Sequence, residues 1–241
     1  MPKRRERVPN GSQAEKGTGD HMKDLRGAIF DLDGTLLDSM KIWEQIDIDF
    51  LRRRGVPPTP DYTAAVTSMD PRSAAEYTIR RYGFLDTPEM LMAEWTQMCR
   101  EAYRSTVPLK PGAGEWVRSL FARGVRIAAA TALSPELFLP ALRRLGIAEC
   151  FSAFACCGEV PRGKGVPDVY LLAAERLRLT ARQCLVFEDI LTGVRGAKAG
   201  GFSVCGVFDE SSAQDWAKIC EEADFALPSF LQAEQIIFGE K

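Results

Sequence analysis

Apolar residues follow two alternating patterns along most of this chain: short continuous runs, and longer stretches with the spacing of one helix face. The runs predict buried strands at residues 28–30, 125–130, 153–157, 184–187 and 202–208. The stretches predict helices at residues 115–123, 136–145, 169–179 and 193–199. Because strands that alternate with helices build parallel sheets, we predict an α/β fold with a doubly wound, Rossmann-like parallel sheet.

Residues 39–106 interrupt this alternation, because they show helical spacing and no convincing strand pattern. Apolar residues with helical spacing mark the first helix: Ile42, Trp43, Ile46 and Phe50. Two further helices are predicted where a capping residue precedes a proline, at Asp70-Pro71 and at Thr87-Pro88. We therefore expect an all-helical insert of three to four helices whose aromatic residues serve packing.

The interruption predicts a core made from two separate parts of the chain. Residues 22–38 and 107–241 form this core, and residues 39–106 form the inserted helical domain. Residues 1–21 are polar and basic, and they lack the apolar segment of a secretory signal. We expect them to be a disordered leader in front of an alternative start at Met22.

Composition narrows the class of protein. The chain has 241 residues, 46% hydrophobic and 27% charged, which is enough for a large domain with a small insert. A net charge of −2 provides no general attraction to nucleic acid or to an anionic membrane, and no apolar run approaches the ~20 residues that span a bilayer. The seven cysteines form no Cys-x-x-Cys pair and the one histidine, His21, lies in the leader, which disfavours a disulfide framework, a zinc site and a catalytic histidine. We expect reduced thiols in a cytoplasmic protein that is a monomer or a weak homodimer.

The most specific feature follows the first predicted strand, where Asp31 and Asp33 are spaced by two. Alternate residues of a strand point to the same side, and Gly34 breaks the strand directly after the pair. The carboxylates should therefore stand at a strand end, which is where open α/β sheets bind ligands. Two carboxylates this close repel each other unless a cation lies between them, and oxygen ligands suit Mg²⁺. One carboxylate could then attack an electrophile while the other transfers a proton.

Three later segments carry, in turn, a hydroxyl group, a cation and a second pair of carboxylates. Thr131 ends a predicted strand with a hydroxyl, and the next backbone N–H, of Ala132, is a second donor for phosphate oxygens. Lys164 can hold the charge of a nucleophile and neutralise phosphate. Glu188 and Asp189 form a second acidic pair at a strand end. Taken alone, a threonine at a strand end is more often structural, so the order of the segments carries the argument.

Together these segments resemble the haloacid dehalogenase superfamily. Residues 31–39, Asp-Leu-Asp-Gly-Thr-Leu-Leu-Asp-Ser, are similar to its first motif. The segments around Thr131, Lys164 and Glu188-Asp189 are similar to its second, third and fourth motifs, in the same order. The resemblance covers roughly residues 26–210, and the helical insert looks like the C1 cap of subfamily I. That group contains β-phosphoglucomutase and the small sugar-phosphate phosphatases.

The resemblance implies a role for each of these residues. Asp31 would attack phosphorus and become an aspartyl phosphate, and Asp33 would protonate the leaving oxygen and then activate the incoming nucleophile. Thr131, the N–H of Ala132 and Lys164 would stabilise the developing charge. The cofactor would be Mg²⁺, held by Asp31, the backbone carbonyl of Asp33, Asp189, and Glu188 either directly or from behind a direct ligand. The partner would be a small phosphorylated metabolite, with no nucleic acid and no membrane.

The resemblance leaves the reaction open. We predict a Mg²⁺-dependent phosphatase for a sugar phosphate or similar metabolite, with a β-phosphoglucomutase-like mutase as the alternative and a non-catalytic ligand-binding protein as a minor one. Related mutases carry a histidine twelve residues after the nucleophile, where this chain has Trp43. Arg72 is a candidate to grip substrate from the cap, or else a solvated arginine at a helix start. A phosphonoacetaldehyde hydrolase is disfavoured, because no lysine occurs between Lys41 and Lys110.

Overall fold

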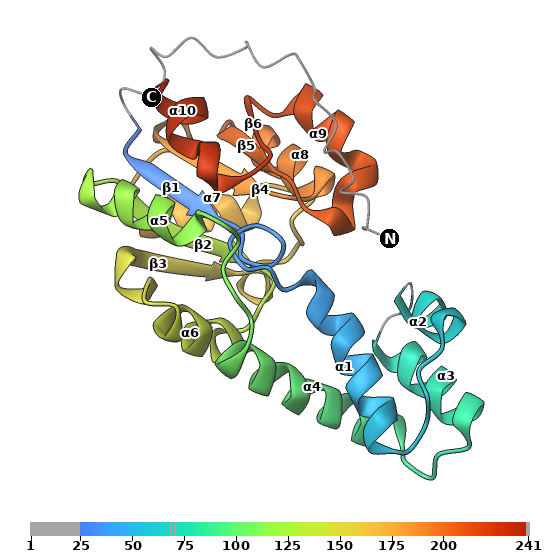
Figure 1. Cartoon of the computed structure of the whole chain (residues 1–241). Coiled ribbons are helices and arrows are strands. Elements are labelled where there is room, and N and C mark those ends of the chain that lie inside the picture. Colours follow the sequence, from blue (N-terminus) through green and yellow to red (C-terminus); the bar gives the residue numbers. More distant parts are fainter. Residues whose placement is uncertain (1–24, 68, 70, 240–241) are drawn as a thin grey trace, which may run out of the picture.

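The computed structural model describes residues 25–67, 69 and 71–239. The predicted leader with His21 and Met22, and the predicted capping residue Asp70, lie outside these residues. Within them, six parallel strands form one sheet in the order β3-β2-β1-β4-β5-β6, with helices on both sides (Figure 1). The predicted doubly wound α/β fold is confirmed.

Five of these strands were predicted from the apolar runs. The strands are β1 (Gly27–Phe30), β2 (Arg126–Thr131), β3 (Phe151–Cys156), β4 (Cys184–Glu188), β5 (Ser203–Val207) and β6 (Phe225–Leu227). The bounds of the first five differ from the prediction by at most two residues at either end. β6 was missed because it is an edge strand of three residues, too short to show a period.

Alternate residues of β1 face opposite layers of helices. Ala28 and Phe30 belong to a hydrophobic cluster with α5 (Ala113–Ala122), α6 (Pro135–Arg144) and α10 (Ala233–Phe238). Ile29 belongs to a second cluster, with α7 (Asp168–Arg176), α8 (Leu191–Ala199) and α9 (Trp216–Glu222). All three β1 side chains are fully buried, as expected for a central parallel strand that is covered on both faces.

The strand order reverses at β1. β2 and β3 extend to one side of it, and β4, β5 and β6 extend to the other. Phe30 pairs in register with Ala129 of β2 and with Phe187 of β4, so the three strands end almost level. A parallel sheet opens a crevice beyond the carboxyl ends of its strands at such a point. Residues that follow β1 and β4 therefore meet there, although they are far apart in sequence.

The helical insert projects away from the sheet (Figure 1). Its described residues form four α-helices: α1 (Met40–Arg53), α2 (Pro60–Thr67), α3 (Pro71–Tyr82) and α4 (Pro88–Ser105). These helices share their own hydrophobic cluster, which includes Phe50, Tyr62 and Leu91, and α4 also packs against α6. The sequence pattern did not locate α2, because its apolar residues do not gather on one side. No helix in the described part of the chain is long and apolar enough to cross a membrane.

Two chain segments connect the insert with the sheet, and they run side by side. Leu37 and Leu109 form an antiparallel bridge. The N–H of Asp38 donates to the Pro108 carbonyl at 3.0 Å, and the N–H of Lys110 donates to the Leu36 carbonyl at 2.9 Å. These contacts make a short two-stranded joint, which lies directly beside the carboxyl end of β1.

Candidate active site

The loop after β1 turns back on itself and presents two aspartates. The N–H of Gly34 donates to the Leu37 carbonyl at 3.0 Å, and the N–H of Leu37 donates to the Leu32 carbonyl at 2.8 Å. Gly34 has a φ of +77°, and a Cβ at this position would collide with the carboxylate of Asp189. Glycine is therefore required here twice, for its backbone conformation and for the close approach of the β4 end.

Asp31 is buried directly beyond β1, where its carboxylate forms an ion pair with the ammonium group of Lys164. The same ammonium lies 2.6 Å from Glu188 Oε1. Burial raises the pKa of Asp31, and the charge of Lys164 opposes that shift. Burial would lower the pKa of Lys164, but the carboxylates of Asp31 and Glu188 raise it above its usual range, so the lysine stays charged. Three residues predicted for the site are thus in direct contact.

The loop that carries Lys164 is positioned by close packing against α8. A Cβ on Gly196, in the second half of that helix, would collide with the backbone carbonyl of Lys164. Only a glycine lets the loop come this near to the helix. The Gly-rich segment after the acidic pair therefore contributes to the site indirectly, because it sets how far Lys164 reaches toward β1.

Three buried carboxylates gather at the ends of β1 and β4. Among the described residues, Asp31, Glu188 and Asp189 each offer one oxygen, and these oxygens lie within 4.8 Å of one another. Tyr170 donates to Glu188 Oε1 at 2.8 Å, and Thr35 donates to Asp189 Oδ1 at 2.8 Å. Burial, together with the charges of Asp31 and Glu188, raises the pKa of Asp189 to about 9. The cluster is therefore short of positive charge.

The chemistry of this cluster fits a divalent cation. Three carboxylates share a single ammonium group, that of Lys164, and buried charge is costly unless it is compensated. A cation among these oxygens would favour the ionised carboxylates and relieve their mutual repulsion. Oxygen-only ligands at this spacing suit a hard ion such as Mg²⁺. Asp31, Glu188 and Asp189 can thus hold the predicted metal, and the backbone carbonyl of Asp33 is the further predicted ligand.

Asp33 lies outside this cluster and is held by two hydroxyl groups. Ser39 Oγ donates to Asp33 Oδ1 at 2.6 Å, and the Tyr103 hydroxyl donates to the same oxygen at 2.5 Å. Burial raises the pKa of Asp33, although both hydrogen bonds oppose that shift. Burial and the Asp33 carboxylate raise the pKa of Tyr103 above its usual range, so its hydroxyl remains a donor. The sequence did not point to Tyr103, which lies 70 residues from Asp33 in a helix whose aromatic residues suggested packing alone.

Thr131 stands at the end of β2 and is buried. Its Oγ1 accepts a hydrogen bond from the Leu133 N–H at 3.1 Å, a contact that does not use the hydroxyl hydrogen. The next residue, Ala132, is exposed at the strand end. Both positions are suited to donate to a ligand beyond the sheet, and the phosphate site predicted there stays a prediction.

Arg72 is the second residue of α3, and its guanidinium group forms ion pairs with Glu89 at 2.9 Å and with Glu76 at 3.4 Å. Its side chain is 60% exposed. These acidic partners belong to the insert and not to the strand ends, so the contacts described here do not bring Arg72 to the carboxylate cluster. The side chain of Trp43 lies outside the described part of the structure.

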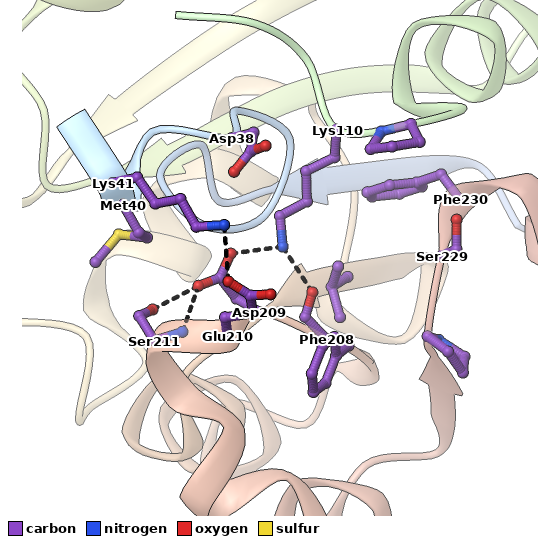
Figure 2. A pocket seen from close by; sticks show the side chains of 13 residues that line it. Asp38, Met40, Lys41, Lys110, Phe208, Asp209, Glu210, Ser211, Ser229 and Phe230 are labelled. Atoms are coloured by element: carbon purple, nitrogen blue, oxygen red, sulfur yellow. Dashed lines mark hydrogen bonds and ion pairs between the residues drawn. The ribbon is translucent and has the colours of Figure 1, made fainter. Parts of the chain in front are cut away.

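A pocket of about 540 Å³ lies beside the two-stranded joint (Figure 2). Lys110 Nζ contacts Asp209 Oδ2 at 2.8 Å and donates to the Phe208 carbonyl at 2.6 Å. Lys41, at the start of α1, contacts Glu210 at 2.8 Å. Four charged side chains of the pocket thus form two ion pairs, Lys110 with Asp209 and Lys41 with Glu210. We interpret these ion pairs as structural contacts that connect the two segments at the base of the insert with the segment after β5.

Comparisons with known proteins agree with this geometry. A phosphorylated carbohydrates phosphatase of Thermotoga maritima is 25% identical over 177 residues, which cover 73% of this chain and 82% of that protein. The mitochondrial (DL)-glycerol-3-phosphatase 1 of Arabidopsis thaliana is 31% identical and covers 84% of this chain with 70% of its own length. Hexitol phosphatase A of Escherichia coli is 29% identical, over 86% of this chain and 92% of its own.

A solved structure has the same fold and a family model matches the sequence. The crystal structure of a candidate β-phosphoglucomutase from Thermotoga maritima superposes with a TM-score of 0.77 at 25% identity, covering 88% of this chain and 96% of that one. The model of the haloacid dehalogenase-like hydrolases matches residues 25–201. This range includes the four segments that meet at the strand ends. The resemblance seen in the sequence is confirmed, and the chain belongs to the haloacid dehalogenase-like hydrolases.

Proposed function

We propose that this protein is a Mg²⁺-dependent phosphatase that hydrolyses a small phosphorylated metabolite, such as a sugar phosphate. The observation that carries the proposal is the arrangement around Asp31, a buried carboxylate in an ion pair with Lys164 and next to a cluster suited to a divalent cation. Asp33, two residues further on, supplies a second carboxyl group in a separate environment. The similarity to three phosphatases supports a phosphomonoester as the substrate.

The reaction needs two displacements at phosphorus. In the first, an Asp31 oxygen forms a bond to phosphorus while the bond to the leaving oxygen breaks, and protonated Asp33 gives its proton to that oxygen. In the second, Asp33 takes a proton from water, the water oxygen attacks phosphorus, and the bond to Asp31 breaks to release inorganic phosphate. Each proton that Asp33 gives in the first step is thus recovered in the second.

Fixed donors would stabilise the charge on the phosphoryl oxygens during both steps. Lys164 stays charged beside Asp31, and Thr131 and the N–H of Ala132 stand at the neighbouring strand end. Mg²⁺, held by Asp31, Glu188 and Asp189, supplies further positive charge when it is bound. Because these groups belong to strand ends and adjoining loops of one rigid sheet, they need little reorganisation during the reaction.

We also propose that the insert, residues 39–106, acts as a cap over a core formed by residues 22–38 and 107–241. The two-stranded joint places the start of α1 and the end of α4 directly at the strand ends. Side chains of the insert would then select the part of the substrate that leaves, because the phosphoryl group itself is bound by the core. Arg72 remains a candidate for such a contact only if it exchanges its pairs with Glu76 and Glu89.

A β-phosphoglucomutase-like mutase is the second candidate, and the similarity to the Thermotoga maritima structure favours it. A mutase must keep its phosphoenzyme intact while one sugar phosphate exchanges for another, and it needs a contact for a second phosphate. The position of the mutase histidine is Trp43 in this chain, and Arg72 is engaged by two glutamates. These features make hydrolysis the better fit.

Phosphate release from a panel of sugar, polyol and nucleotide monophosphates, with and without Mg²⁺, tests the proposal. We expect release from one class of substrate, and we expect it to disappear without metal and in Asp31→Asn. Asparagine has nearly the same volume as aspartate, so an unchanged circular dichroism spectrum would show that the variant is folded. Wild-type activity in Asp31→Asn would refute the mechanism. Slow release from every compound, with isomerisation of a hexose 1-phosphate in the presence of a hexose bisphosphate, would indicate the mutase.

A further inference from the structure

The Asp33 side chain accepts hydrogen bonds from both ends of the helical insert. Ser39 immediately precedes α1, and Tyr103 lies in the last turn of α4. Both hydroxyl groups donate to the same carboxylate oxygen, Oδ1, at 2.6 and 2.5 Å. Two donors on one oxygen fix the rotation of the carboxyl group and leave Oδ2 for another task.

Ser39 departs from the ordinary role of its position. A serine at a helix N-cap usually accepts a hydrogen bond from a backbone N–H of the first turn. Ser39 occupies the N-cap of α1, yet its side chain makes no capping hydrogen bond and donates to Asp33 instead. A local rule that is broken in this way often marks a functional constraint.

Tyr103 is held firmly enough to act as a fixed donor. Its side chain is fully buried in the same hydrophobic cluster as Leu36 and Leu37, which belong to the loop that carries Asp33. The backbone around it is anchored as well, because Arg144 of α6 donates to the carbonyls of Tyr103 and Val107. A buried hydroxyl must find a partner to offset its desolvation, and the single hydrogen of this one goes to Asp33.

We propose that Tyr103, together with Ser39, is a positioning residue that orients Asp33 so that Oδ2 exchanges the proton with the leaving oxygen. The inference rests on the proposed phosphatase function and goes beyond it, because it assigns a role to a residue outside the four motifs. Orientation matters to such a step, since a proton donor must lie within hydrogen-bond reach of the atom that it protonates. Without Tyr103, the carboxyl group would keep one donor and gain rotational freedom.

The proposal also predicts which substrates depend on Tyr103. An alkoxide is a strong base and leaves poorly without a proton, whereas 4-nitrophenolate is a weak base and leaves without one. Proton transfer from Asp33 should therefore matter for sugar or polyol phosphates and not for 4-nitrophenyl phosphate. A residue that acts only by orienting Asp33 must show the same division between the two kinds of substrate.

The experiment compares kcat/KM for two substrates in the wild-type protein and in Tyr103→Phe, with Mg²⁺ present. The substrates are 4-nitrophenyl phosphate and the best alkyl monophosphate of the panel. The ratio kcat/KM covers the steps up to departure of the first product, so a slow second displacement does not obscure the result. We expect kcat/KM to fall at least about tenfold for the alkyl phosphate and less than about twofold for 4-nitrophenyl phosphate.

Three further comparisons make the result specific to the orientation of Asp33. Tyr62→Phe removes another fully buried tyrosine hydroxyl of the insert, one that contacts Thr78 at 2.9 Å, and it should leave both ratios unchanged. In an Asp33→Asn background, adding Tyr103→Phe should change kcat/KM for the alkyl phosphate by less than about twofold, because the group that it orients is already gone. Ser39→Ala should show the same division between substrates as Tyr103→Phe.

Equal losses on both substrates, or a full further loss in the Asp33→Asn background, would show that Tyr103 acts only on the structure as a whole and would overturn the proposal. No loss on either substrate would overturn it too. In these cases the proposed phosphatase would still stand, because wild-type turnover of the panel establishes it separately. If the wild-type protein hydrolyses neither substrate, the proposed function fails and this inference fails with it.

Discussion

The strand ends and the helical insert differ in how their buried charges are compensated. At the strand ends, three buried carboxylates lie around the ammonium group of Lys164, and burial together with the charges of Asp31 and Glu188 raises the pKa of Asp189 to about 9. In the insert, the largely buried Arg54 meets Glu94 at 2.6 Å and Asp86 at 3.3 Å, and its guanidinium carbon lies 4.0 Å from the centre of the Phe50 ring. One region is short of a cation, whereas in the other a largely buried cation has two acidic partners.

Three other arginines of the insert also form ion pairs with acidic side chains. Arg81 contacts Asp61 at 2.6 Å, Arg72 contacts Glu89 at 2.9 Å, and Arg100 reaches Glu136 of α6 at 3.3 Å. Cations that are engaged in this way stabilise the insert and its contact with the sheet, and they are poorly placed to bind a second phosphate. The comparison teaches that the chemistry is concentrated at the strand ends, while the insert contributes shape and the hydroxyl groups that hold Asp33.

Replacing a largely buried cation with methionine should have its largest effect at the strand ends, where Lys164 lies; Arg54→Met, described below, is the corresponding change in the insert. Lys164→Met leaves Asp31 and Glu188 buried without their ammonium group, so we expect kcat/KM to fall about 100- to 1,000-fold and the free energy of unfolding to drop by about 3 to 5 kcal/mol. Phosphate release and urea unfolding measure the two effects. If Lys164→Met kept more than a tenth of the activity, the charge balance described for the strand ends would be wrong.

The metal requirement should belong to the strand ends alone. Asp189→Asn removes one of the three carboxylates, so we expect the Mg²⁺ concentration for half-maximal activity to rise at least about tenfold. The metal-free protein should become more resistant to urea at pH 7, because the raised pKa of Asp189 makes folding protonate a carboxyl group that is ionised in the unfolded chain, and asparagine avoids that cost. Asp86→Asn, a matched change in the insert, should leave the Mg²⁺ dependence unchanged. An identical Mg²⁺ response of both variants would contradict the assignment of the metal site.

Arg54→Met should affect stability and little else. It removes two ion pairs and the cation–π contacts with Phe50 and Phe84, and we expect the free energy of unfolding to fall by about 1 to 3 kcal/mol. The value of kcat/KM should stay within about twofold of wild type, since the substituted side chain does not reach the strand ends. The control is Arg52→Met, because Arg52 is 65% exposed and meets Asp49 only at 3.7 Å. A loss of activity as large as that of Lys164→Met would erase the distinction between the regions.

The smallest expected effect on stability belongs to Asp209, in the pocket beside the two-stranded joint, and this effect should depend on pH. Although burial raises it, Lys110 and Ser211 hold the pKa of Asp209 below its usual range. A carboxylate whose pKa is lowered on folding adds stability above its unfolded pKa, about 3.9, and that stability is lost as the pH falls through the folded value. Asp209→Asn should therefore lower the free energy of unfolding at pH 7, by about 1 kcal/mol if it weakens a single hydrogen-bonded contact, and the difference from wild type should shrink below about pH 4.

Urea unfolding at several pH values measures this difference. Glu210→Gln is the matched control from the same pocket, because Glu210 and its partner Lys41 are both 73% exposed and such pairs contribute little. A difference between wild type and Asp209→Asn that grew as the pH fell would reverse the sign of the argument and would show that the Lys110 pair does not stabilise the joint.

Local pattern predicted the chemistry of the site better than its complete set of residues. Asp31, Lys164 and Glu188 were identified because each follows or ends an apolar strand or lies in a recognisable segment, and the structure places them in contact. The sequence did not identify Tyr103 as a site residue. Its spacing within α4 is that of a packing residue, and nothing in the neighbouring sequence indicates its contact with Asp33. Arg72 was named because the resemblance to related mutases suggests a cap arginine at this position, and its partners in the fold are Glu76 and Glu89, so its contact with substrate stays a prediction.

The sequence by itself determined the elements whose signals are local. Largely apolar runs of three to seven residues predicted β1 to β5, and the spacing of Asp31 and Asp33 before Gly34 predicted carboxylates at a strand end. Only the tertiary structure decided which distant groups meet: that β1 lies between β2 and β4, and that Ser39 and Tyr103 close on one oxygen of Asp33. The physical reason is that periodicity fixes which way a side chain points along its own element, whereas its partner depends on how the buried faces of separate elements pack together.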